Sequence, residues 1–193
     1  MKKLFTLLLA TMVLQCAWAQ NSEHMKFKGV PIDGTLKEFT AKLVQKDFTK
    51  IGSENGQAIL VGDFAGFRDC IIYVSALQNK DLVNCVATFL PSKSQWSILE
   101  QDYNMLKTML TQKYGEPSEV IEEFQTYSEP RSDDMKLLYL KTDKCKYETS
   151  FVCENGVIIL KMAHIGYDSC FVVLTYYDSI NTKLATGSAI DDL

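Results

Sequence analysis

The side chains best suited to acid–base or nucleophilic chemistry are the two histidines and six cysteines of this 193-residue chain. His24 lies near the start of the chain, and His164 lies in an alternating apolar segment typical of a strand. A cysteine nucleophile would need a thiol next to His164. The strand register that we predict instead places Tyr147 and Phe171 beside His164, which favours a hydrogen-bonded structural histidine.

Sequence motifs of the common catalytic and cofactor sites are missing. The chain contains no G-x-S-x-G, H-E-x-x-H, Walker or G-x-G-x-x-G motif, and no C-x-x-C pair. The acidic cluster of Glu129, Asp133 and Asp134 lacks the alternating oxygens and glycine of a calcium loop, so we interpret it as a solvated loop. Glu122 and Glu123 point to opposite faces of a predicted strand and cannot form a glycosidase pair. The sequence therefore predicts no catalytic residues, no metal and no cofactor, and it favours a non-catalytic protein.

The first nineteen residues predict export. Two lysines at residues 2–3 precede an apolar run at residues 4–14, and Ala-Trp-Ala at residues 17–19 forms a small-x-small cleavage site. The apolar run is shorter than the roughly 20 residues that a membrane-spanning helix needs. We expect a signal peptide over residues 1–19 and a mature chain, residues 20–193, that is periplasmic or secreted and has no transmembrane segment.

Cys16 indicates an alternative, a lipoprotein signal whose cysteine becomes the lipidated N-terminus. Such signals favour a small residue directly before the cysteine, and Gln15 occupies that position. The sequence therefore disfavours lipoprotein anchoring through Cys16.

The formal net charge is −4 and no window is strongly basic, which argues against a nucleic-acid partner.

The hydrophobic pattern predicts two amphipathic helices and two runs of strands. Thr35 and Glu38 form a capping box before the first helix, and the second helix runs from Trp96 to a stop at Tyr114-Gly115. We expect strands at residues 59–64, 70–77, 82–90, 120–124, 137–141, 145–153, 157–165 and 170–177. This order predicts a single α+β domain over residues 20–193, with both helices packed on largely antiparallel β-meanders. The helix-then-meander order occurs twice and indicates a tandem α-β repeat with halves at residues 25–91 and 92–186.

Five cysteines remain after cleavage of the predicted signal peptide, so at least one must stay free or pair with another molecule. If Leu77 pairs with Leu82, one apolar face carries Cys70 and Cys85, and Phe89 lies on the same face. The predicted hairpin around Asn155-Gly156 places Cys145 and Cys153 on its apolar face. The same face carries Ile158, Leu160, Met162 and His164. We expect these four thiols to be buried small hydrophobes and Cys170 to lie on the opposite face.

The opposite face of the last hairpin is more apolar than a solvated sheet face should be. The predicted register places Ile159, Ala163, Val172, Leu174 and Tyr176 there. Either these strands are covered on both sides, or the patch binds a partner. Our candidate binding surface is Tyr73, Ile159, Leu174 and Tyr176.

The segment KFKGVPIDGTL, residues 26–36, follows the predicted signal peptide. It resembles the corresponding segment of a group of uncharacterised exported proteins of Bacteroides-type bacteria. The resemblance implies a periplasmic or secreted location in a Gram-negative cell and implies no activity. The repeated helix-then-meander architecture is also similar to beta-lactamase-inhibitor-like proteins, whose saddle-shaped sheet grips a partner protein, although no motif is shared.

These observations favour an exported, non-catalytic binding or interaction protein of the bacterial envelope, whose partner is another envelope protein or a small ligand. The alternative is a periplasmic hydrolase with a site centred on His164 or a free cysteine. A third possibility is a structural component of the envelope with a scaffolding role.

Overall fold

The computed structural model describes residues 23–77 and 80–190, so the predicted signal peptide lies outside the described residues. Eight strands form one sheet in the order β3-β4-β5-β6-β10-β9-β8-β7, and every neighbouring pair is antiparallel. The strands are β3 (Thr49–Glu54), β4 (Gln57–Phe64), β5 (Phe67–Leu77), β6 (Leu82–Phe89), β7 (Glu119–Phe124), β8 (Cys145–Cys153), β9 (Gly156–Ile165) and β10 (Ser169–Asp178). The fold is α+β, as the sequence predicts.

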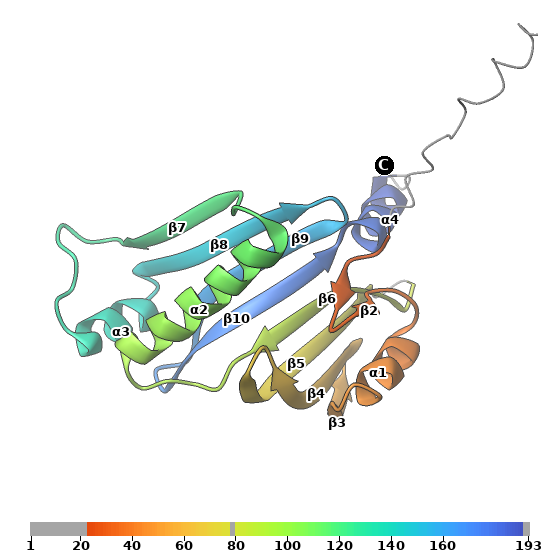
Figure 1. Ribbon diagram of the computed structural model, residues 1–193, viewed down its shortest axis with the longest axis horizontal. Coiled ribbons are helices and arrows are strands. Elements are labelled where there is room, and N and C mark those ends of the chain that lie inside the picture. Colours follow the sequence, from red (N-terminus) through yellow and green to blue (C-terminus); the bar gives the residue numbers. More distant parts are fainter. Residues whose placement is uncertain (1–22, 78–79, 191–193) are drawn as a thin grey trace, which may run out of the picture.

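Four helices of the described ranges accompany this sheet. They are α1 (Leu36–Val44), α2 (Trp96–Tyr114), α3 (Asp133–Lys141) and α4 (Ser179–Ile190), and a small hairpin of β1 (Lys26–Phe27) and β2 (Val30–Pro31) precedes α1. Figure 1 shows α1 over the half of the sheet that contains β3 and β4, and α2 over β8–β10. Each half has one helix followed by four strands, with α3 inserted between β7 and β8, and the halves meet where β6 pairs with β10. The sequence predicts the helix-then-strands order, but with three strands in the first half and five in the second.

Helices α1 and α2 form where the sequence predicts them. The Thr35 side chain accepts a hydrogen bond from the Glu38 backbone N–H, and the Glu38 side chain accepts one from the Thr35 backbone, which completes the capping box. Helix α2 buries the whole predicted stripe of large side chains against the sheet, namely Trp96, Leu99, Tyr103, Leu106 and Leu110. These side chains belong to one hydrophobic core between the helices and one face of the sheet.

Helix α3 corrects two predictions. Residues 137–141, expected as a strand, lie in this helix, and Asp133 and Asp134 form its first turn rather than a loop. Ser132 caps the helix by accepting a hydrogen bond from the Met135 backbone N–H. Leu137 and Leu140 are buried one helical turn apart, so a short apolar run that also suits a strand packs here as a helix.

The acidic cluster has a structural function that its composition does not reveal. The residue before α2, Gln95, makes no side-chain capping bond. Instead, both the backbone N–H and the hydroxyl of Ser97 donate to Asp133 Oδ2, at 3.0 and 2.8 Å. Glu129 forms an ion pair with Lys136 at 2.9 Å. Asp133 thus ties the start of α2 to the start of α3 and offsets the positive end of the α2 dipole.

We expect Asp133→Asn to lower the urea midpoint of unfolding at pH 7 more than Asp134→Asn does. The backbone N–H and then the hydroxyl of Ser97 hold the pKa of Asp133 below its ordinary value of 3.8. A lowered folded-state pKa stabilises the fold above the unfolded-state pKa, and this contribution is lost as the pH falls through the folded-state pKa. The stabilities of wild type and Asp133→Asn should therefore converge as the pH falls below 3.8 and through the lowered folded-state pKa. A midpoint difference that persists unchanged at low pH would contradict this role of the carboxylate.

A β-bulge in β6 changes the predicted faces of the first meander. Leu77 pairs with Leu82 as expected, but Ser75 pairs with Cys85 and Ala76 with Val83, so Asn84 is an extra residue. One extra residue moves every later side chain of the strand to the other face. Cys85 and Phe89 therefore lie on the face away from the helices, opposite to the prediction, while Cys70 stays in the core.

No helix within residues 23–77 and 80–190 is long and apolar enough to cross a membrane.

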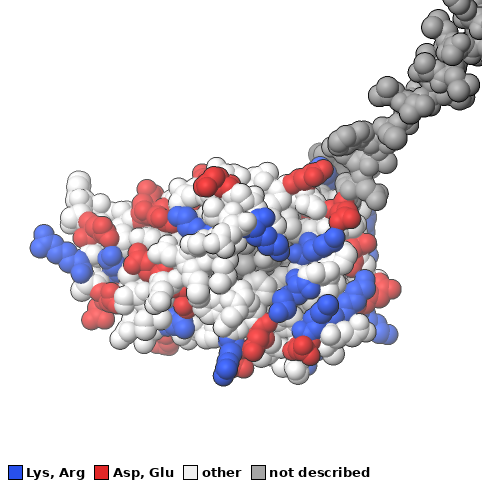
Figure 2. Space-filling view, viewed as in Figure 1, with Lys and Arg blue, Asp and Glu red and all other residues white. Residues whose placement is uncertain are grey.

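Figure 2 views the molecule from the same side as Figure 1, and lysine, arginine, aspartate and glutamate side chains are interspersed over the surface seen there. The helix-covered side of the sheet therefore presents an ordinary charged surface to solvent.

Candidate binding surface

The side of the sheet away from α1 and α2 differs from the helix-covered side. We call it the open face; its residues on the central strands are Ile71, Tyr73, Ser75, Cys85, Ala87, Phe89, Val157, Ile159, Lys161, Ala163, Ile165, Phe171, Val173, Thr175 and Tyr177. Phe171 and Val173 are only 6% and 3% exposed, yet they are not part of the core cluster under the helices. Neighbouring side chains on the open face itself therefore bury them.

Three aromatic rings follow one another across the open face. The ring centroids of Tyr73 and Phe89 are 5.2 Å apart at a steep angle, and those of Phe89 and Phe171 are 5.4 Å apart. These three rings come from β5, β6 and β10, which are adjacent in the sheet. They join the two halves of the molecule across the β6–β10 pair. Such contacts between aromatic rings hold each ring in a fixed orientation.

The aromatic row forms part of a half-open groove of about 320 Å³, which we call the aromatic groove. It is lined by Asp69, Ile71, Tyr73, Phe89, Leu90, Pro91, Ser92, Ile165, Ser169 and Phe171. Most of these side chains are apolar, and the two serines, the aspartate and the hydroxyl of Tyr73 supply the polar groups. A concave, mostly apolar site with a few polar groups is the usual form of a binding site.

Asp69 is the one charged residue in the lining of the aromatic groove. Its backbone adopts the left-handed conformation with φ 54°, and its N–H donates to Asp63 Oδ1 at 3.2 Å. Asp69 also lines a neighbouring polar cavity of about 420 Å³ with Lys28, Lys46 and Asp47 among its other residues. Asp69 therefore lies at the boundary between an apolar and a polar depression.

Two of the four predicted surface residues lie on the open face, and two do not. Tyr73 lines the aromatic groove, and Ile159 lies farther along the open face on β9. Leu174 and Tyr176 are only 1% and 5% exposed and belong to the core under the helices. Tyr176 packs edge-on against Phe27 with ring centroids 5.6 Å apart.

The length of the β9–β10 loop explains this correction. Ile165 pairs with Ser169, so three residues connect the two strands and odd-numbered residues pair with odd-numbered ones. Ile159 is therefore opposite Thr175, whereas Leu174 is opposite Leu160 of the core. A loop one residue shorter or longer would reverse the faces of β10. The same register places Val172 and Cys170 on the core side, which corrects the expected position of both.

Phe89 and Phe171 are the groove residues that sequence analysis missed. The predicted register placed Phe89 on the core face and Phe171 beside His164. The structure instead pairs His164 with Cys170 and directs both phenylalanine rings to the open face. One signal could have shown that residues on both faces of β10 are buried. The strand is apolar on both faces, which is typical of a strand in the middle of a sheet.

His164 makes two contacts that do not involve a thiol. Its Nδ1 lies 2.8 Å from the Gly166 carbonyl oxygen and its Nε2 lies 3.2 Å from the exposed carboxylate of Asp143. Both contacts are to acceptor oxygens, so the ring is held by the β9–β10 turn and the loop after α3. Cys170, its partner across the strands, is fully buried. Among the described residues, the two hydrogen-bond contacts of the His164 ring are to Gly166 and Asp143, and neither is to the thiol of Cys170.

The cysteines have the protonation behaviour of packed thiols. Burial raises the pKa of Cys145 to about 12 and the pKa values of Cys70 and Cys85 to about 11. Burial also raises the pKa values of Cys153 and Cys170. A cysteine nucleophile needs a lowered pKa, so these shifts run in the direction opposite to activation. The raised pKa values of these thiols do not favour the alternative of a hydrolase with a cysteine nucleophile.

Within the described ranges, no three histidine, cysteine, aspartate or glutamate side chains cluster closely enough to hold a metal ion. All five cysteines in these ranges are free thiols. Comparison of the chain with protein-family models, with curated proteins and with solved structures found no match. The functional argument therefore rests on the geometry of the open face.

Proposed function

We propose that this chain is an exported, non-catalytic binding protein of the bacterial envelope and that it holds a partner protein on its open face. The observation that carries the proposal is the one-sided covering of a continuous sheet. Helices α1 and α2 cover one face, while the other presents Tyr73, Phe89 and Phe171 as an aromatic row around a groove. Aromatic side chains are enriched at the centres of protein–protein interfaces.

The surroundings of the groove favour a protein as the partner over a small ligand. A volume of about 320 Å³ is at the lower end of the range for small-molecule sites. Apolar side chains on this face also reach solvent, since Ile165 and Ile71 at the sides of the groove are 66% and 40% exposed, and Tyr177, outside the groove lining, is 39% exposed. Exposed apolar side chains around a shallow groove are typical of a docking surface for another macromolecule.

The proposal of export rests on the first nineteen residues. Their positive start, apolar run and small-x-small end have the layout of a cleaved signal peptide. The partner that we propose is accordingly another protein of the envelope, which the mature chain meets after export.

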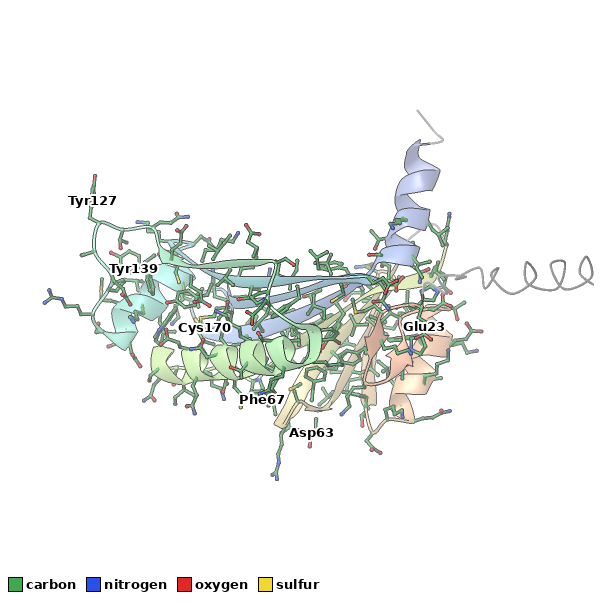
Figure 3. All side chains as sticks on the ribbon, turned by 45° about the horizontal axis from the view of Figure 1, so that its top comes forward. Glu23, Asp63, Phe67, Tyr127, Tyr139 and Cys170 are labelled. Carbon is green, nitrogen blue, oxygen red and sulfur yellow. The ribbon has the colours of Figure 1, made fainter. Side chains whose placement is uncertain are left out.

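We expect Tyr73→Ala to weaken capture of the partner at least tenfold, whereas Tyr127→Ala should leave it unchanged. Tyr73 lines the aromatic groove on the open face, and removal of an aromatic side chain from an interface commonly costs about 2 kcal/mol of binding. Tyr127 is fully exposed on the loop between β7 and α3, far from Asp63 and Phe67 at the end of the β4–β5 hairpin (Figure 3).

The measurement uses tagged mature chain as bait in envelope extract, with captured proteins quantified by mass spectrometry. The same substitution at two positions controls for loss of a tyrosine as such. Equal capture by wild type and Tyr73→Ala would contradict the proposal, as would loss of capture with Tyr127→Ala alone.

A further inference from the structure

We propose that the aromatic groove receives an arginine side chain of the partner protein. In this arrangement the guanidinium group pairs with the carboxylate of Asp69 and stacks on the aromatic row. The inference rests on the proposed function, because it names the chemical class of the residue that the partner supplies.

The charge in the groove is the first observation. Asp69 is the single charged residue of the lining, and its carboxylate forms no ion pair among the described residues. Its backbone N–H bond to Asp63 holds the residue in place without using the Asp69 carboxylate. A partner that covered this carboxylate with an apolar side chain would bury an unpaired charge, which is costly. The groove therefore favours a cation.

The aromatic row selects arginine over lysine. Phe89 lies between Tyr73 and Phe171, with ring centroids 5.2 and 5.4 Å away. A planar guanidinium stacks on aromatic faces and loses less hydration than a compact ammonium group. It also offers two parallel N–H donors to a carboxylate. Ile71 and Ile165 at the sides of the groove would contact the aliphatic part of the same side chain.

The experiment compares two probes that differ in charge and have nearly the same shape. Nα-acetyl-arginine N-methylamide and the corresponding citrulline derivative are titrated into mature chain with isotope-labelled phenylalanine and tyrosine rings. We expect the arginine probe to shift the ring signals of Phe89 and Phe171 with saturation in the millimolar range. The citrulline probe should bind at least about fivefold more weakly, because it lacks the charge-assisted hydrogen bonds.

Two variants locate the charge. Asp69→Asn should bind both probes equally, whereas Asp47→Asn should keep the preference of wild type for arginine. The two positions are matched, because both backbones are left-handed, with φ 54° at Asp69 and 67° at Asp47, and asparagine tolerates this conformation. Asp47 lines the polar cavity and not the aromatic groove. Equal binding of the two probes to wild type would overturn the inference, and so would loss of discrimination in Asp47→Asn.

Failure of this inference and failure of the proposed function give different results. If the probes bind equally but Tyr73→Ala still loses the partner, the partner docks on the open face without an arginine. If arginine binding depends on Asp69 but Tyr73→Ala captures the partner normally, the groove selects arginine and the partner binds elsewhere.

Discussion

Gly156→Ala is expected to destabilise the fold by about 3 kcal/mol. Gly156 is the first residue of β9 and pairs with Asp178 of β10. A Cβ atom at Gly156 would lie 2.1 Å from the carbonyl oxygen of Tyr177 and 2.6 Å from Cε of Met25. The methionine side chain can move, but the carbonyl belongs to the central strand of the sheet. Two strands would have to separate locally to admit one methyl group.

The matched control for this substitution is Gly52→Ala. Gly52 lies in the edge strand β3, and a Cβ there would meet only Ile59 at ordinary contact distances of 3.8 and 4.0 Å. Its φ is not in the left-handed region, so alanine should change the free energy of unfolding by less than about 1 kcal/mol. Urea unfolding of the two variants measures the difference. Equal stability of Gly156→Ala and Gly52→Ala would show that β9 and β10 do not approach as closely as described.

Asp178→Ala is expected to destabilise the fold by about 2–4 kcal/mol. Asp178 is fully buried at the end of β10. Its Oδ1 accepts from the Met25 backbone N–H at 2.7 Å, and its Oδ2 accepts from the Asn181 backbone N–H at 2.8 Å. His24 also contacts Oδ2, at 3.1 Å. Removal of the carboxylate leaves two buried N–H groups without an acceptor.

Asp178 also joins both ends of the described chain. Met25 lies before β1, and Asn181 lies in α4, where its side chain donates to the carbonyl oxygens of Ile32 and Val83. We therefore expect the Met25 amide to exchange with solvent much faster in Asp178→Ala than in wild type. Asp134→Ala, at an exposed position in α3, is the control for loss of a carboxylate. If the two alanine variants have the same urea midpoint and the same exchange at Met25, the buried carboxylate does not hold the N-terminal segment.

The elements with a one-sided apolar pattern could be predicted from the sequence. The stripe from Trp96 to Leu110 has one apolar face, and α2 buries that face. The β8–β9 hairpin has the predicted faces although its turn is one residue earlier than expected, because Cys153 rather than Glu154 begins the turn. That change moves the register by two residues, and a two-residue shift keeps every side chain on its face.

Two glycine-containing turns show what local pattern alone could not decide. Asn55 and Gly56 both have positive φ, at 50° and 75°, and form the two-residue turn between β3 and β4. Sequence analysis did not predict β3. Gly156, by contrast, lies after its turn and is required by the close approach of β10 rather than by a positive φ. The same dipeptide thus serves two purposes, and only long-range contacts distinguish them.

The candidate site could be predicted only in part, for two physical reasons. Strand β10 is apolar on both faces, so alternation does not say which set faces the helices. The bulge at Asn84 reverses the faces of β6, and no residue pattern in that strand marks it. Tyr73 lies on an unbroken strand paired with β4, and its position on the open face was predicted. Phe89 and Phe171 required the observed registers.

Binding through the open face is tested most directly by photo-cross-linking in the cell envelope. A benzophenone amino acid replaces Tyr73 in one strain and Tyr127 in another, and adducts of the mature chain are resolved by mass after irradiation. We expect one discrete protein adduct from position 73 and none from position 127. Absence of an adduct at position 73, or the same adduct at both positions, would contradict docking on the open face.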